Sequence, residues 1–320
     1  MKRNIIVIGA SAGGVEAVPR LLGSLRADIQ AAIFVSLHIA PYNESVMPQL
    51  ISRAGRLPAQ HALHGMAIRP GMVYVAPPDH HLLVGPDVIE LSHGPKENRH
   101  RPAIDPMFRT AAQVYGNRVA GVLLTGNLDD GVSGLQIIKE NQGLTIVQDP
   151  AEAPFPQMPR NALEAFKPDH VLKLKQIENL LARLPNSPNG GGKMKKRARP
   201  TPQPLQTGAV PTDGEPAPLV CPECHGPLWE IRNGELVRYQ CLVGHRYSLD
   251  NLLAGHAEGL EAALWTALRA LEERVVLQRR LADQCRAAGR KSGERMFQQR
   301  LIESEKHART LRTILEKCKL

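Results

Sequence analysis

Short apolar runs alternate with amphipathic stretches through the first 184 residues of the chain. Residues 5–8 form a β-branched run that ends at Gly9, which is typical of a buried strand, and a helical pattern of apolar positions follows from Gly13 to Leu25. Further strands are predicted at 32–37, 119–124, 144–147 and 170–172, and further helices around 46–51, 104–114, 132–140, 160–166 and 176–184. This alternation predicts an α/β fold in which helices cover both faces of a doubly wound, mostly parallel sheet.

Residues 66–93 interrupt this alternation. Three short apolar runs, at 72–76, 81–84 and 88–91, are separated by turns rich in proline, glycine and aspartate. Such spacing is typical of short antiparallel strands, so we predict a β-hairpin insertion here.

The second half of the chain has a different pattern. Residues 185–219 contain eight prolines and five glycines, and their few apolar side chains cannot offset chain entropy, so they are predicted to be a linker. Its basic run, Lys193–Arg199, is interpreted as a solvated surface. From residue 260, apolar positions recur every three or four residues in two stretches that are broken near 289–293, which predicts two amphipathic helices folded as a hairpin. The predicted divisions are an α/β domain at 1–184, the basic linker at 185–219, a cysteine-containing module at 220–256 and the helical hairpin at 257–320.

Charge and hydropathy exclude several classes of protein. The net charge is +9 over 320 residues, but residues 1–184 contribute only +2, from 18 Lys and Arg against 16 Asp and Glu. The charge therefore gives little support for binding a phosphate backbone, and a nucleic-acid partner is disfavoured. No apolar run approaches the roughly 18 residues that a membrane span needs, and the N-terminus lacks the longer apolar stretch of a secretory signal. We therefore expect a cytoplasmic protein without a membrane span.

Two residues that could carry chemistry end the first two predicted strands. Ser11 lies in Gly9–Gly13, which matches the G-x-S-x-G turn that exposes a serine nucleophile between a strand and a helix. A phosphate-binding turn would need glycine at Ser11, whereas a plain glycine turn remains an alternative from this motif alone. His38 ends the next strand, where a neutral imidazole could accept the serine proton.

A pair of carboxylates follows the strand at 119–124. Asp129 or Asp130 could orient His38, and either could instead cap the helix that follows. The chain order Ser–His–Asp differs from the Ser–Asp–His order of α/β-hydrolases, which argues against that family. Further histidines, at 80, 81, 93 and 100, gather near the hairpin insertion, where surface or packing roles are expected.

Five motifs in one order resemble a known family. They are Gly9–Gly14, the strand ending in His38 before Pro41, Arg101–Phe108, Leu124–Gly131 and Met158–Arg160. Together they make residues 4 to about 184 similar to the catalytic domain of CheB-type protein-glutamate methylesterases of bacterial chemotaxis. Because the first strand begins at residue 5, the resemblance is to a stand-alone form without a receiver domain.

The resemblance implies a function and a set of site residues. Ser11 is then the nucleophile, His38 the general base and then acid, and Asp130 the carboxylate that orients His38. The implied reaction hydrolyses glutamyl methyl esters on the cytoplasmic helices of chemoreceptors, or on another methylated signalling protein, and members of the family also deamidate glutamines. No cofactor is implied for catalysis. Backbone N–H groups near Ala12 and in the Gly126–Asn127 loop are the expected oxyanion donors.

Departures from the family pattern keep a second interpretation open. Ala12 stands where many members carry threonine, and Asn127–Leu128 replaces the usual Met-Gly, so substrate preference is in doubt. The alternative function is a non-catalytic chemosensory regulator or scaffold that acts through the C-terminal module and the helical hairpin. The hairpin is also a candidate for self-association.

The C-terminal cysteines indicate a metal site. Cys221, Cys224, Cys241 and His245 follow the pattern C-x₂-C-x₁₆-C-x₃-H, in which two close pairs of ligands can converge on a tetrahedral ion. Three thiolates and one imidazole suit structural Zn²⁺, with no open position for catalysis. A redox C-x-x-C, no metal at all, and His225 in place of His245 are the alternatives. Outside this pattern, Cys285 and Cys318 are interpreted as small side chains on the hairpin.

Overall fold

We analysed a computed structural model of the protein, which describes residues 4–39, 45–184, 214–233 and 236–317. Pro41, the basic run Lys193–Arg199, most of the predicted linker and Cys318 lie outside the described residues. The chain divides into two compact units, Met1–Leu252 and Leu253–Leu320.

A seven-stranded sheet forms the centre of the first unit. Its strands are β1 (Ile5–Ala10), β2 (Ala32–Leu37), β3 (Ala59–His61), β4 (Val73–Val75), β7 (Val119–Leu123), β8 (Leu144–Gln148) and β9 (His170–Leu172). They lie in the order β3-β4-β2-β1-β7-β8-β9, and every neighbouring pair is parallel. Because β1 lies between β2 and β7, the carboxyl ends of these three strands meet at a topological switch point, where open α/β sheets place their sites.

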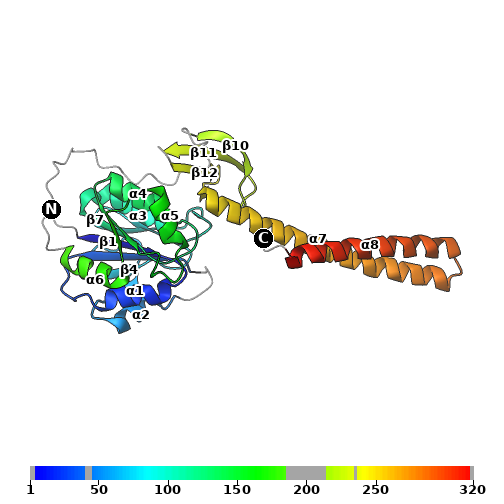
Figure 1. Cartoon of the computed structure of the whole chain (residues 1–320), viewed down its shortest axis with the longest axis horizontal. Coiled ribbons are helices and arrows are strands. Elements are labelled where there is room, and N and C mark those ends of the chain that lie inside the picture. The colour runs from blue at the N-terminus through cyan, green and yellow to red at the C-terminus, as the bar shows by residue number, and fades with distance from the viewer. Residues whose placement is uncertain (1–3, 40–44, 185–213, 234–235, 318–320) are drawn as a thin grey trace. The chain divides into compact units, whose positions relative to one another are not determined.

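Helices cover both faces of this sheet (Figure 1). One face carries α1 (Gly14–Gly23), α2 (Met47–Ala54) and α6 (Leu174–Arg183); the other carries α3 (Ile104–Tyr115), α4 (Val132–Glu140) and α5 (Gln157–Ala165), with a short 3₁₀ turn, η1 (Gly116–Arg118), after α3. Alternate β1 side chains serve the two cores: Ile6 and Ile8 pack towards α1, whereas Ile5 and Val7 pack towards α3. The predicted doubly wound sheet is therefore confirmed, with its central strands buried on both faces and its edge strands β3 and β9 partly exposed.

The hairpin insertion is smaller than predicted. Strands β5 (His81–Val84) and β6 (Ile89–Ser92) form the expected antiparallel pair. The prediction was wrong for residues 72–76, because β4 joins the main sheet beside β2, with Tyr74 buried against Phe34. Strand β3 was not predicted, since its three residues are too few and too polar to show an apolar period.

A second, antiparallel sheet belongs to the same unit. It consists of β10 (Gly214–Val220), β11 (Pro227–Asn233), β12 (Leu236–Cys241) and β13 (Arg246–Tyr247). We call residues 214–252 the Cys/His module. Strand β10 begins inside the segment predicted to be a linker, because an edge strand tolerates prolines that a central strand would exclude. The first unit ends at Leu252, within the segment 220–256 predicted for the cysteine-containing module.

Two long helices make up most of the second unit. They are α7 (Leu249–Ala287), which starts eight residues before the predicted 257, and α8 (Lys291–Lys317). Their turn contains Gly289 in the left-handed region, near the predicted break, and cross-helix pairs such as Arg279–Glu305 join them as a hairpin. Among the described helices, none is both long and apolar enough to cross a membrane.

Candidate functional site

Ser11 follows β1 directly and precedes α1. Its backbone N–H donates to Thr125 O at 3.0 Å, which ties the serine to the end of β7. Gly13 caps α1 with a φ of 76°, a conformation that favours glycine. The chain thus turns sharply and leaves Ser11 partly exposed between strand and helix.

His38 lies between Ser11 and Asp130. Its Nδ1 is 2.9 Å from Ser11 Oγ, and its Nε2 is 2.7 Å from Asp130 Oδ2. For Nδ1 to accept the serine hydroxyl, the ring must carry its proton on Nε2, which then donates to Asp130. The structure therefore brings together the three residues that the sequence placed after β1, β2 and β7.

Asp130 is held by backbone and side-chain donors at the start of α3. Oδ2 accepts from Ile104 N at 2.6 Å, and Oδ1 accepts from Asn98 Nδ2 at 2.9 Å and from Asp105 N at 3.3 Å. Burial raises the pKa of Asp130, but these hydrogen bonds and the one from His38 outweigh it and hold the pKa below its usual range. The carboxylate is thus kept ionised.

His100 covers the other face of the His38 ring. The two rings stack with centroids 3.6 Å apart and planes 11° from parallel. Burial, and then the neighbouring His38, lower the pKa of His100 to about 3, so this ring stays neutral. Of the histidines near the hairpin insertion, His100 therefore packs directly on the candidate base.

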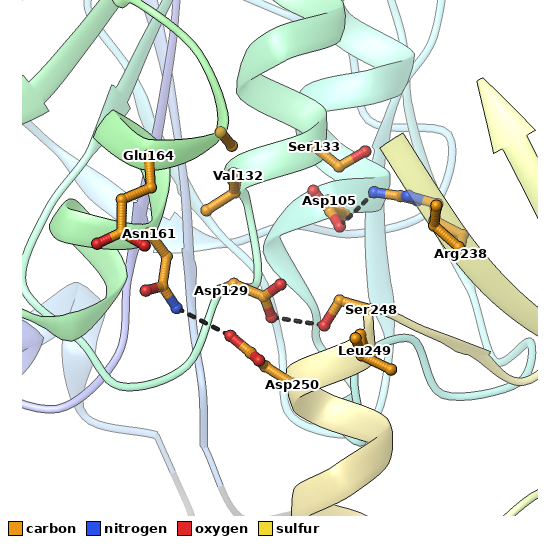
Figure 2. Close-up of a pocket in the computed structure, with 12 residues that line it drawn as sticks. Asp105, Asp129, Val132, Ser133, Asn161, Glu164, Arg238, Ser248, Leu249 and Asp250 are labelled. Carbon is orange, nitrogen blue, oxygen red and sulfur yellow. Dashed lines mark hydrogen bonds and ion pairs between the residues drawn. The ribbon is translucent and has the colours of Figure 1, made fainter. Parts of the chain in front are cut away.

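Asp129 points away from His38, towards the Cys/His module. It accepts hydrogen bonds from Ser248 Oγ and Asn251 Nδ2, and its burial raises its pKa to about 6. It lines a pocket between the α/β domain and the module, shown in Figure 2. Asp129 and Asp105 are among the acidic residues there, and Arg238 is the basic one; Ser11, His38 and Asp130 do not line it. The structure thus separates the two adjacent carboxylates that the sequence left as rivals.

One expected oxyanion donor is already in use. Gly126 N donates to Phe155 O at 2.9 Å, so this N–H is not free for a substrate. In the described part of the chain, the N–H groups of Ala12 and Asn127 donate to no protein acceptor, which leaves them as the candidate donors. Within the expected Gly126–Asn127 loop, Asn127 is therefore the candidate donor.

The four candidate metal ligands converge in the module. One possible ligand atom from each of Cys221, Cys224, Cys241 and His245 lies within 4.8 Å of every other, and His225 is not among them. Burial raises the pKa of Cys221, but hydrogen bonds from His245 and Tyr247 lower it to about 6. Burial and the adjacent thiols raise the pKa of Cys224 to about 11. The crowded thiols cannot all be ionised together unless a positive charge lies between them. A divalent cation would supply that charge and neutralise several thiolates at once, so the donor set fits Zn²⁺.

Sequence reasoning missed the residues that connect the module to the site. Asn98 and Asp105 lie more than 130 residues before Arg238 and Ser248, and the two pairs follow no shared period, so no one-dimensional pattern groups them. Asn98 and Arg99 both have a positive φ, which is uncommon for residues other than glycine and marks an unusual loop. This backbone conformation cannot be read from the sequence.

Comparison with known proteins places the α/β domain in a known group. A family model described as CheB methylesterase matches residues 6–181. A putative protein-glutamate methylesterase/protein-glutamine glutaminase of Leptospira interrogans is 40% identical over 185 residues, which cover 58% of this chain and 96% of that relative. A protein of Anaeromyxobacter dehalogenans, named protein-glutamate methylesterase/protein-glutamine glutaminase 2, is 39% identical over 180 residues, covering 56% of this chain and 53% of its own length.

A solved structure agrees with these relatives. The crystal structure of the Thermotoga maritima CheB methylesterase catalytic domain matches with a TM-score of 0.55 and 29% identity, covering 57% of this chain and all of that one. The family match ends at residue 181, before the Cys/His module begins.

Proposed function

Because the chain belongs to the CheB methylesterase family, we propose that it is a serine hydrolase that demethylates glutamyl methyl esters on chemoreceptor proteins. The observation that supports this most is the continuous hydrogen-bond chain from Ser11 Oγ through His38 to Asp130. The relatives' names also include a glutaminase activity, so deamidation of glutamines by the same residues is part of the proposal.

The proposed mechanism is acyl transfer through Ser11. His38 Nδ1 takes the hydroxyl proton while Oγ attacks the ester carbonyl, and Asp130 stabilises the imidazolium that forms. Ala12 N–H and Asn127 N–H donate to the developing oxyanion. The tetrahedral intermediate then expels methanol, which leaves with the proton from His38. A water molecule, deprotonated by His38, attacks the acyl-enzyme and releases glutamate and free Ser11.

Methanol release from methyl-labelled receptor membranes tests this proposal. Ser11→Ala should leave the fold intact and lower turnover by about 10⁶-fold, the scale for losing a triad serine. Ser52→Ala, which removes an exposed hydroxyl that only accepts from Ala59 N, is the matched control and should keep parental activity. Near-parental release by Ser11→Ala would reject Ser11 as nucleophile, and absence of release from the parent would favour the non-catalytic regulator.

We also propose that Cys221, Cys224, Cys241 and His245 hold one structural Zn²⁺. The converging atoms and the crowded thiols support it. Protein purified under reducing conditions should carry about one zinc per chain, as expected for a four-ligand site. Cys224→Ser should lower that content, whereas Cys285→Ser, on α7, should not. Zinc-free protein with a folded module would contradict the proposal.

A further inference from the structure

The Cys/His module places arginines on buried carboxylates of the α/β domain. Arg238, on β12, lies 2.8 Å from Asp105, whose side chain is 2% exposed. Arg246, on β13, lies 3.8 Å from Glu97, which is 1% exposed and also pairs with Arg109. A buried carboxylate stripped of its partner costs several kcal/mol. The module is therefore joined to the α/β domain by buried ion pairs. Figure 2 shows one of them, Asp105–Arg238, at the interface between the module and the domain.

Asn98 lies between this interface and the candidate triad. Its side-chain amide is 4% exposed, and Nδ2 donates to Asp130 Oδ1 at 2.9 Å and to Asp105 Oδ2 at 3.0 Å. One amide group therefore connects the carboxylate that faces His38 with the carboxylate that faces Arg238.

The module fixes the direction in which this amide points. Ser248 N donates to Asn98 Oδ1 at 3.1 Å, and Asn98 N donates to Arg246 O at 2.8 Å. Because the amide oxygen faces a donor from the module, its NH₂ group must face the two carboxylates. Ser248 lies three residues after His245, so the fold of the metal site sets the position of this N–H.

From these contacts we infer that Asn98 is a positioning residue for Asp130, and that the Cys/His module completes the hydrolase site by holding Asn98 in place. The inference rests on the proposed function for the role of Asp130. It deepens that function, because a segment outside the family match then contributes to the geometry of the triad.

Removing the amide has two physical consequences. Asp130 Oδ1 keeps only the 3.3 Å bond from Asp105 N, so the carboxylate gains freedom to rotate away from His38. The carboxylate also becomes more basic, which favours the protonated form of the imidazole beside it. The surrounding charges stay in place: Asp105 beside Asp130, Glu97 with Arg109 and Arg246, and Lys96 and Arg99 near the neutral His100 ring.

Asn98→Gly tests the inference in the full-length chain. Asn98 has a φ of 50°, which glycine adopts freely, so the backbone contacts with Arg246 can persist. We expect kcat to fall about tenfold, equivalent to about 1.4 kcal/mol of transition-state stabilisation. KM should stay within about twofold, since the lost contact is not with substrate. The acid limb of the kcat/KM profile should move to higher pH.

The matched control is Arg232→Ala. Arg232 lies on β11 of the same module, is 71% exposed, and pairs with Glu230 rather than with the α/β domain. It should leave kcat and the pH profile at parental values. A profile in Asn98→Gly that keeps its shape and loses only amplitude, or parental kinetics, would overturn the inference.

A second measurement needs no substrate. At a fixed pH, the NMR resonance of the His38 Nε2 proton, which lies in the hydrogen bond to Asp130, should shift or broaden in Asn98→Gly relative to the parent and to Arg232→Ala. An unchanged resonance in a folded variant would overturn the positioning role. If the parent released no methanol, the proposed function would fail, and this resonance would still decide whether Asn98 acts on the Asp130–His38 pair.

Discussion

At the scale of single residues, neighbouring carboxylates at the end of β7 have opposite electrostatic roles. Asp130 receives donors at both oxygens and stays ionised, as the proposed role of stabilising an imidazolium would require. Asp129 is also buried, but its donors are two uncharged side chains, so burial dominates and its pKa rises to about 6. Asp105 and Asp250 add to that rise. One position in the sequence therefore decides between a contact with His38 and a contact with the module.

The raised pKa of Asp129 makes stability depend on pH. Between about pH 4 and 6 the folded state binds a proton that the unfolded state has released, so this group's contribution falls as pH rises through that window. We expect Asp129→Asn, which keeps an acceptor for Ser248, to stabilise the first unit at pH 7 by about 1–2 kcal/mol. The gain should shrink towards pH 4, because Asp129 is then protonated in the folded state and increasingly protonated in the unfolded state.

Thermal unfolding at both pH values measures this effect. Asp283→Asn, at a 59% exposed position on α7 in the second unit, is the control and should leave the unfolding temperature of the first unit unchanged. Equal stabilisation by Asp129→Asn at pH 4 and pH 7 would mean that folding does not raise the pKa of Asp129.

At the scale of elements, the close approach of α3 to β1 supports the candidate triad. Ile104 begins α3, and its N–H donates to Asp130. A Cβ added at Gly9 on β1 would lie 2.3 Å from Ile104 Cγ2, and one added at Gly131 would lie 2.7 Å from the same atom. The two glycines therefore leave the space into which Ile104 packs. The positive end of the helix then faces the carboxylate and helps to keep it ionised.

Gly9→Ala should disturb this contact. The added methyl group pushes Ile104 away from β1, so we expect a loss of about 1–3 kcal/mol of stability, typical of overpacking. Methanol release should also fall, because Asp130 loses a backbone donor. Ile104→Ala in the same chain should recover part of both losses, because it removes the clashing atoms.

The control for this prediction is Gly259→Ala. Gly259 lies within α7 with nothing within 4 Å of an added Cβ, so alanine there should raise helix stability by about 0.5–1 kcal/mol. Parental activity and stability in Gly9→Ala would show that the approach of α3 can widen at no cost.

At the scale of the whole molecule, the Cys/His module and the α/β domain share one compact unit although the family match covers only the domain. The module has its own small core, with Cys221, Tyr239 and Tyr247 at its centre. That core is too small to be stable by itself without a staple such as a metal. The proposed metal site should therefore affect the α/β domain as well as the module, because the two share one compact unit.

Removal of zinc with a chelator should disturb the candidate triad, because the module holds Asn98 against Asp130. In protein shown to carry the metal, we expect removal to lower the Tm of the first unit and to slow labelling of Ser11 by a fluorophosphonate probe by about tenfold, as Asn98→Gly does. In an Asn98→Gly background, removal should slow labelling much less, because the two changes break the same connection. If zinc removal and Asn98→Gly slowed labelling independently, so that their effects multiplied, this coupling would be contradicted. Labelling of Ser11→Ala measures the reaction of the probe at other residues.

The positions of the strands followed from the sequence, because apolar runs and their periods report burial directly. Residues such as Ser11 and His38 could be found because each follows such a run, and parallel strands bring their carboxyl ends together. The exceptions are short or polar: β3 carries no apolar period, β4 was assigned to the hairpin, and β10 is an edge strand with prolines.

The order of the residues by itself thus determined an α/β domain with a serine, a histidine and a carboxylate at one sheet edge, followed by a cluster of four metal-type ligands. Only the tertiary structure decided which aspartate contacts His38. It also brought together Asn98 and Ser248, which are 150 residues apart and form a hydrogen bond beside that aspartate. Local patterns report which face of an element is buried, because burial repeats with the period of a helix or strand. A hydrogen bond between two loops has no period, so it exists only once the whole chain has folded.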